Sequence, residues 1–145
     1  MKGLDTPALL ALLHGEPSLR PLLKGWQGEE IATTELNMLE LTWIALGAAP
    51  RLRGERLRVL ERLRRRLTVL PIDSRTQAEL ARRGECGATS GGSGMVGAIF
   101  AALAAAGCSE VLTSGSGRAG NLVKVALARK ARKDVKTSQK RNQRT

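Results

Sequence analysis

Aromatic residues are scarce in this chain, at 2% of its 145 residues, and tyrosine is absent. The core is therefore expected to consist of Leu, Ala, Val and Ile side chains. An aromatic platform that stacks single-stranded nucleic acid is not expected. Trp26 and Trp43 are interpreted as packing residues, because large side chains are valuable in such a core. The single histidine, His14, excludes a zinc site built from several histidines and is expected at the surface, at a helix end.

Cysteines and long apolar runs are also few. Cys86 and Cys108 share no short metal-ligand spacing, and we expect both to be reduced, as in a cytoplasmic protein. The longest apolar run lies near Met95–Gly107, well short of the roughly 20 residues that span a bilayer. An acid at position 5 precedes any long apolar stretch, so neither a signal peptide nor a membrane segment is expected.

Positive charge is abundant and unevenly placed. The net charge is +11, of which residues 121–145 supply +8 through nine Lys or Arg and one Asp. We therefore divide the chain into a folded domain, residues 1–125, and a basic, flexible tail, residues 126–145. Two interpretations of the tail stay open: an arm that binds the phosphates of nucleic acid, or a solvated segment that only aids solubility.

A second basic cluster lies within residues 51–66, which hold eight Arg and two Glu. Leucines recur there at mostly three- and four-residue steps, a pattern that predicts an amphipathic helix with a cationic face. The stripe consists of Leu52, Leu57, Leu60, Leu63 and Leu67. If this face and the tail contact RNA, the expected contacts are Arg62, Arg65, Arg66, Lys130, Arg132 and Lys133.

Strand-like and helix-like segments alternate along the chain. Strands are predicted up to Asp5 and over residues 31–34, 67–72, 111–113 and 122–125, and helices over residues 8–13, 19–23, 36–46, 51–66, 74–83 and 95–106. Thr6 is expected to cap the first of these helices, and Ser74 and Gln77 are spaced as a capping box. The alternation predicts an α/β fold with a central parallel sheet and a site at the carboxyl ends of its strands.

Two acids fall where such a site is expected. Asp5 closes the first strand, and Glu40 lies in the helix that follows the second. If those strands are neighbours, both carboxylates face one crevice. Paired carboxylates suit Mg²⁺ or Mn²⁺, which prefer oxygen ligands and can activate water for attack on a phosphodiester.

The segments that carry these acids resemble a known family. Leu4–Leu13 is similar to the opening of PIN domains of the VapC toxin type, and Ile31–Leu41 is similar to their second strand and acidic helix. The leucine–arginine helix followed by Leu67–Asp73 matches their layout, so the resemblance covers residues 4–83. It implies a three-layer α/β/α fold, Mg²⁺-dependent endoribonuclease activity in the cytoplasm, a homodimer and a small antitoxin partner.

The resemblance also assigns site residues. Asp5 matches the first family acid and Glu40 the second, with Glu35 as the weaker candidate for the second. The family then has an acid at the start of the helix over residues 95–106, where this chain has Ser93 or Val96, depending on the alignment. A further family acid follows the next strand, where Gly115 stands. Hydroxyl contacts are expected from Thr6, Ser93, Thr113 and Ser114.

Three outcomes of this departure stay open: Glu85, Glu110 or Asp73 is recruited, the nuclease is weak, or it is inactive. The alternative to an endoribonuclease is a non-catalytic PIN-like module that binds RNA or protein. A third hypothesis is a Rossmann-like dinucleotide binder, because residues 92–97 fit the pattern G-x-G-x-x-G. That pattern should follow a strand, whereas a helix is predicted before it.

Overall fold

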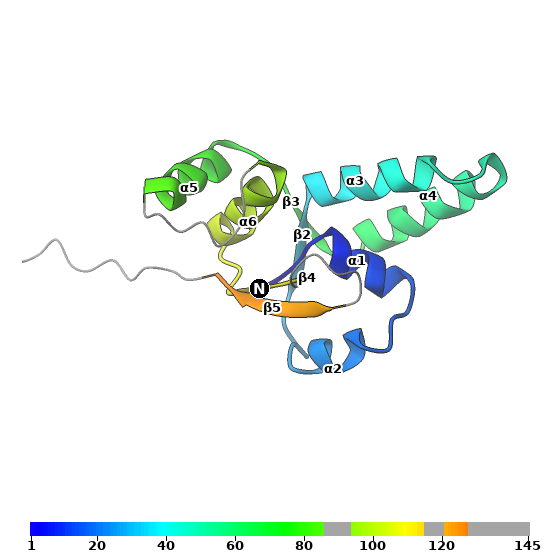
Figure 1. Ribbon diagram of the computed structural model, residues 1–145, viewed down its shortest axis with the longest axis horizontal. Coiled ribbons are helices and arrows are strands. Elements are labelled where there is room, and N and C mark those ends of the chain that lie inside the picture. Colours follow the sequence, from blue (N-terminus) through cyan, green and yellow to red (C-terminus); the bar gives the residue numbers. More distant parts are fainter. Residues whose placement is uncertain (86–93, 115–120, 128–145) are drawn as a thin grey trace, which may run out of the picture.

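The strands of the described residues form one five-stranded sheet with helices on both faces (Figure 1). The computed structural model describes residues 1–85, 94–114 and 121–127. The spatial order is β3-β2-β1-β4-β5. In chain order the strands are β1 (Lys2–Leu4), β2 (Ile31–Thr34), β3 (Thr68–Leu70), β4 (Glu110–Ser114) and β5 (Leu122–Ala126).

Pairing between the strands is parallel for β1 with β2, β1 with β4 and β2 with β3, whereas β5 runs antiparallel to β4. The predicted three-layer α/β/α fold is therefore confirmed, with one correction: the sheet has an antiparallel edge strand. Hydrophobic alternation marks a strand but does not encode its direction. The four parallel strands place their carboxyl ends at one edge of the sheet.

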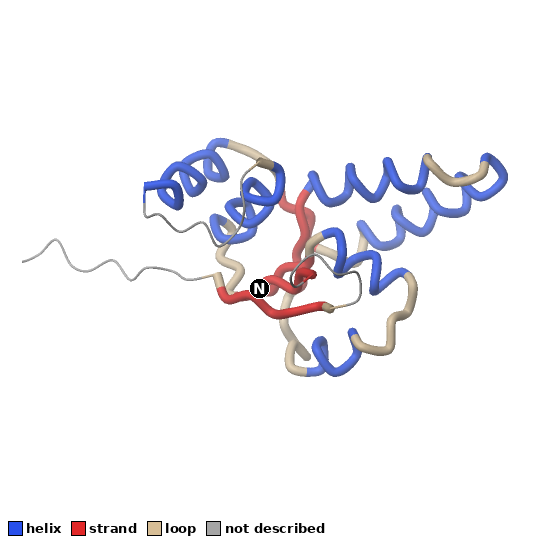
Figure 2. Tube along the Cα trace, in the orientation of Figure 1, coloured by secondary structure: helices blue, strands red, loops and turns tan. Residues whose placement is uncertain are grey.

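Helices cover the two faces in separate groups. In chain order they are α1 (Thr6–Leu13), α2 (Leu19–Lys24), α3 (Glu35–Leu46), α4 (Pro50–Arg64), α5 (Ser74–Glu85) and α6 (Met95–Ala105). Leu4 and Leu112 face a core shared with α1 to α4, while Ala32 and Val111 face α6. α5 packs against α6, and α3 and α4 lie side by side as a projecting arm (Figure 2). Within the described ranges, every helix is too short or too polar to cross a bilayer.

Gly3 permits α6 to approach the centre of the sheet closely. A Cβ atom at this position would lie 3.0 Å from both Cδ atoms of Leu103 and 3.1 Å from Cγ2 of Val111. A side chain there would require the side chains of Leu103 and Val111 to move by a few tenths of an ångström. β1, which ends just before Asp5, lies between two packed layers.

Two predicted helix caps are wrong by one residue. Asp5, not Thr6, caps α1, because its Oδ1 accepts a hydrogen bond from the backbone N–H of Ala8 at 3.3 Å. At the start of α5, Asp73 rather than Ser74 accepts from the N–H groups of Arg75 and Thr76. In both cases the acceptor is the carboxylate of the residue immediately before the residue whose hydroxyl was predicted to cap the helix. Asp is as effective a cap as Ser.

The two tryptophans differ sharply in environment. Trp26 is 3% exposed and lies at the amino-terminal edge of the sheet, where it confirms the packing prediction. The prediction for Trp43 is wrong, since that side chain is 79% exposed on α3. The apolar residues of α3 are distributed over several faces of the helix, so its sequence does not define a single buried face.

Candidate active site

Asp5 and Glu40 lie at the same, carboxyl edge of the sheet. β1 and β2 are parallel neighbours, so the residues that follow them, Asp5 and the start of α3, emerge at the same edge. Thr6 links the two acids: it follows Asp5 in the chain, and its Oγ1 donates a hydrogen bond to Oε2 of Glu40 at 2.5 Å. Burial is the main cause of the raised pKa of Asp5, and the negative charge of Glu40 adds to it, as expected for neighbouring carboxylates.

Asp5 is a buried acid with partners on both oxygens. Asp5 is 8% exposed. Its Oδ1 accepts a hydrogen bond from the backbone N–H of Ala8, and its Oδ2 accepts one from the hydroxyl of Thr113 at the end of β4. Burial raises the pKa of Asp5 above its ordinary value, and the charge of Glu40 adds to this rise. The hydrogen bonds from Thr113 and Ala8 oppose it. A cation beside these two acids would relieve their mutual repulsion.

A buried asparagine that the sequence analysis missed lies beneath the pair. Asn37, in the first turn of α3, is 0% exposed, and its Nδ2 donates to Oγ1 of Thr6 at 3.0 Å. Its Oδ1 accepts from the N–H of Thr34, which completes a capping box with Thr34 as the N-cap. The available signal was the Thr34-x-x-Asn37 spacing, which differs from the usual capping box only in having Asn for Glu or Gln.

The other acids that were considered are engaged elsewhere. Glu35 forms a two-pronged ion pair with Arg64, at 2.6 and 3.1 Å. Glu110 begins β4 at the opposite end of the sheet, where Lys2 Nζ and Trp26 Nε1 donate to it. Asp73 pairs with Arg75. These contacts leave Asp5 and Glu40 as the two carboxylates that the described structure brings together at this edge.

The remaining predicted positions divide between described and undescribed residues. Ser114 ends β4 beside Thr113 and is half-buried. Val96, in the first turn of α6, has no oxygen to offer a metal and is 52% exposed. Ser93 and Gly115 lie outside the described residues, as do Lys130, Arg132 and Lys133. The side chain of Glu85 is likewise outside the described part.

The donor set at this edge fits a hard divalent cation. Mg²⁺ is commonly held by one or two carboxylates, with water and substrate phosphate completing its shell. Asp5 and Glu40 supply two carboxylates, and Thr6 and Thr113 add hydroxyl oxygens next to them. Within the described ranges, no three His, Cys, Asp or Glu side chains gather in a way that could hold a metal ion. The fit therefore depends on two acids rather than the three or four that the resemblance implied.

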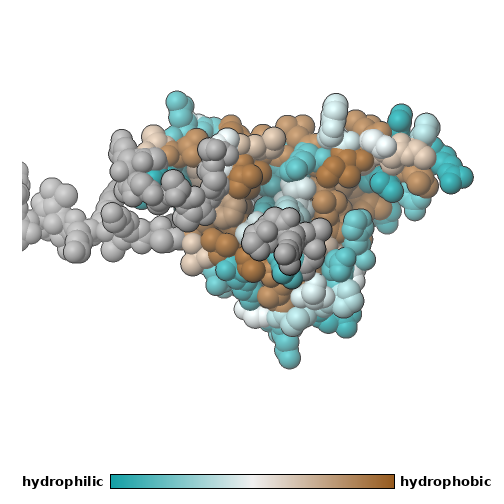
Figure 3. Space-filling model, in the orientation of Figure 1, coloured by the Kyte–Doolittle hydropathy of each residue, from teal (hydrophilic) through white to brown (hydrophobic). Residues whose placement is uncertain are grey.

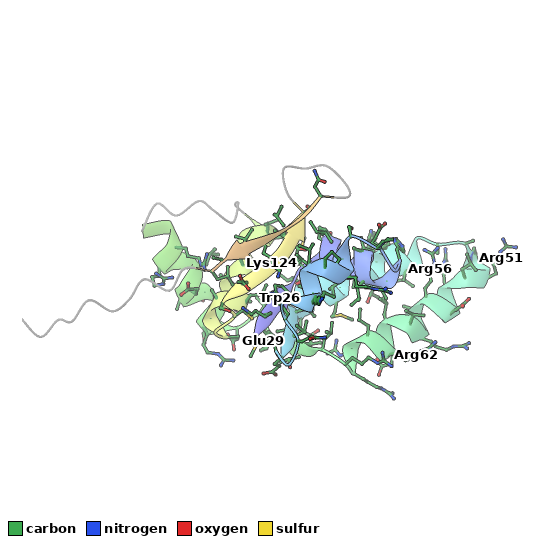
Figure 4. The ribbon with its side chains drawn as sticks, turned by 90° about the horizontal axis from the view of Figure 1, so that it is seen from below. Trp26, Glu29, Arg51, Arg56, Arg62 and Lys124 are labelled. Atoms are coloured by element: carbon green, nitrogen blue, oxygen red, sulfur yellow. The ribbon has the colours of Figure 1, made fainter. Side chains whose placement is uncertain are left out.

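The cationic helix runs along the arm. Figure 4 shows Arg51, Arg56 and Arg62 spread along α4. Arg62 and Arg66 line a shallow hollow whose apolar walls include Leu13 and Leu63. Of the predicted stripe, Leu60 and Leu63 are buried, while Leu57 remains 37% exposed. Leu52, at the start of the helix, is half-buried, so the amphipathic prediction holds along the helix with Leu57 as the exception.

Comparison with known families and structures decides the relationship. A model of the PIN domain matches residues 3–119. The chain belongs to the PIN domain family. This match includes residues 92–97, so the glycine pattern there lies within a PIN domain and not in a separate dinucleotide fold. No curated protein matches the chain significantly.

Solved structures of VapBC proteins share the fold. VapBC2 from Rickettsia felis, bound to a promoter DNA fragment, has 16% identity and a TM-score of 0.63, covering 84% of this PIN domain chain and 95% of its own. DNA-bound VapBC from Salmonella typhimurium has 19% identity and a TM-score of 0.58, covering 74% and 83%. VapBC-5 from Mycobacterium tuberculosis, of a toxin–antitoxin family, has 27% identity and a TM-score of 0.55, covering 79% and 84%. The resemblance to VapC-type PIN domains is confirmed.

Proposed function

We propose that this PIN domain is an endoribonuclease of the toxin–antitoxin type that depends on Mg²⁺ or Mn²⁺ and turns over slowly. The observation that supports this most is the juxtaposition of Asp5 and Glu40, tied through Thr6, at the carboxyl edge of the sheet. A bound divalent ion would neutralise charge on the phosphodiester and activate a water molecule. The slow turnover follows from the donor set, because two carboxylates hold such an ion less firmly than three or four.

The residues of the chain have distinct tasks in this proposal. Asp5 and Glu40 hold the cation, and Thr113 favours the ionised form of Asp5 by donating a hydrogen bond to it. Arg62, Arg65 and Arg66 attract the RNA backbone, since clustered cations displace counterions from nucleic acid. Ala126 ends β5 and Leu127 is buried in the core, so the basic tail that is proposed to extend this attraction begins after Leu127, two residues later than predicted.

Cleavage of an end-labelled RNA with Mg²⁺, with Mn²⁺ and with chelator tests the proposal. Glu40→Gln and Asp5→Asn are expected to lower the rate by about 100-fold or more, because each removes charge from the cation site. The matched control is Glu35→Gln, an acid on the same helix whose partner is Arg64. It is expected to cleave at the wild-type rate. Equal rates for Glu35→Gln and Glu40→Gln would contradict the assignment.

A second function is favoured by one specific observation. The described residues offer two acids at the edge and no cluster of three. A PIN-like module that binds RNA or protein without cleaving would carry such a reduced site. RNA binding without cleavage, together with an Asp5→Asn variant that behaves like wild type, would establish this alternative in place of the enzyme.

Protein partners belong to the same proposal. The structural neighbours are VapBC complexes, so we propose a small antitoxin protein as partner and a homodimer in the cytoplasm. The arm offers an apolar surface for such contacts, since Leu39 is 64% and Trp43 79% exposed; Figure 3 shows apolar side chains on its visible face. Sedimentation of the purified chain at micromolar concentration is expected to show a dimer, and a monomer would contradict it.

A further inference from the structure

Behind the two acids lies a chain of hydrogen bonds that begins at the buried Asn37. Both ends of its side-chain amide are occupied: Nδ2 donates to Thr6, and Oδ1 accepts from Thr34. The residue is 0% exposed and lies on α3 three residues before Glu40. It does not itself contact either carboxylate among the hydrogen bonds of the described residues.

The orientation of this amide is fixed by a neighbouring group that can donate a hydrogen bond but cannot accept one. The backbone N–H of Thr34 lies 3.2 Å from Oδ1 of Asn37, and a backbone N–H can only donate. The oxygen therefore faces Thr34, and the nitrogen must face Thr6. Because the amide nitrogen only donates, Oγ1 of Thr6 acts as its acceptor at 3.0 Å.

That assignment determines where the proton of the Thr6 hydroxyl goes. The hydroxyl has one proton, and Oε2 of Glu40 lies 2.5 Å from Oγ1. An ionised carboxylate can only accept, so the proton points to Glu40. We infer that Asn37 is a positioning residue, which acts through Thr6 to hold the carboxylate of Glu40 beside Asp5.

This inference rests on the proposed function and explains how the protein holds the carboxylate of Glu40 in place. Glu40 belongs to an exposed part of α3, where a long side chain would otherwise sample several rotamers. Thr6 and Asn37, at 4% and 0% exposure, are held rigidly by their surroundings and so restrict it. Preorganising one of only two carboxylates lowers the entropic cost of binding a cation there.

The first test measures binding of Mn²⁺ alone by calorimetry or electron paramagnetic resonance. Thr6→Val removes the hydroxyl at nearly constant volume and is expected to weaken Mn²⁺ binding by about 10-fold, since the variant lacks a hydrogen bond to a charged group. Thr6→Ser retains the donor and is expected to restore most of the affinity. The matched control is Thr42→Val, whose hydroxyl donates to the carbonyl of Met38 on the same helix. A Thr6→Val variant with wild-type affinity would overturn the inference.

The second test needs no metal and distinguishes this inference from the proposed function. In crystal structures of the metal-free protein, Asn37→Asp keeps an acceptor for Thr34 but replaces the donor to Thr6 with an oxygen. The proton of Thr6 is then expected to turn toward residue 37, and Glu40 to leave its place beside Asp5. Glu40 unmoved in both Asn37→Asp and Thr6→Val would refute the positioning role. A wild-type protein that binds no Mn²⁺ would refute the metal site, while these structures would still decide the role of Asn37.

Discussion

Thr113 donates a hydrogen bond to Asp5 across 108 positions of sequence. The bond joins the ends of β4 and β1, which are parallel neighbours in the sheet. It lowers the pKa of an acid that burial would otherwise raise further. The candidate site is thus a compromise, in which packing disfavours the charge of Asp5 and a few hydrogen bonds partly restore it.

The raised pKa of Asp5 predicts how stability depends on pH. Its causes are burial first and the charge of Glu40 in addition. A carboxyl whose pKa is higher in the folded state contributes stability below the unfolded value of about 3.8, and that contribution is lost as the pH rises through the folded pKa. Asp5→Asn, which keeps a good helix cap, is therefore expected to raise the melting temperature at pH 7.

Thermal denaturation of wild type and Asp5→Asn between pH 3 and pH 8 checks this. The difference in melting temperature is expected to shrink toward the acidic end, where Asp5 is protonated in both folded and unfolded chains. Contributions from carboxyl groups that do not interact with Asp5 cancel in the difference. A constant difference across the range would contradict the assignment to Asp5.

Cys108 is predicted to resist alkylation. Burial raises the pKa of its thiol to about 11, so only about one molecule in a thousand carries the thiolate at pH 8. In a Cys86→Ser variant, mass spectrometry after iodoacetamide at pH 8 should find the Cys108 peptide unmodified in the folded protein and modified in urea. Rapid labelling of the native protein would show that this side of the sheet is open.

The amino-terminal edge of the sheet depends on two cations over Trp26. Nζ of Lys124, on β5, lies 5.1 Å from the centre of the Trp26 ring, and Nζ of Lys2 lies 6.0 Å away (Figure 4). Lys124→Met keeps most of the stem and removes the charge, so the unfolding free energy should fall by about 0.5–1 kcal/mol. Urea denaturation followed by circular dichroism measures this change. Lys24→Met, an exposed lysine of α2, is the control, and an equal loss there would argue against the ring contact.

The salt dependence of RNA binding is predicted to locate the RNA-binding face. Removing Arg62 and Arg66 together, by substitution with Gln, should reduce the slope of log affinity against log salt by about 0.7 for each phosphate of a single strand that the variant no longer neutralises. The matched control removes two charges from α2, with Arg20→Gln and Lys24→Gln. Filter binding between 50 and 200 mM salt supplies the slopes. Equal effects of the two pairs would indicate a general charge effect instead of an interface on α4.

The elements could be predicted because their signals are local. The placement of Asp5 and Glu40 at one edge came from the resemblance to VapC-type PIN domains, because the alternation of strands and helices does not by itself say which strands are neighbours. The direction of β5 could not be predicted, since the side-chain pattern of so short a segment indicates a strand without fixing its direction. The exposure of Trp43 could not be predicted either, because α3 has apolar residues on several faces and its sequence does not show which face is buried.

Asn37 escaped prediction because its contribution arises only in the folded structure. Asparagine in the first turn of a helix usually indicates a local cap and nothing more. Its second bond, to Thr6, joins positions 31 residues apart and requires β1 and β2 to be neighbours. The role of Ser93 stays a prediction, since this residue lies outside the described residues.

Strand order also constrains how this protein can be made. β1 leaves the ribosome before β4, one of its two sheet neighbours, which follows about a hundred residues later in the chain, since Gly3 pairs with Val111. Until then, the nascent chain presents an unpaired edge of β1, and Asp5 lacks the hydrogen bond that Thr113 donates in the folded protein. Translation that stops before β4 is therefore expected to release a fragment without an assembled cation site and with a strand edge open to aggregation.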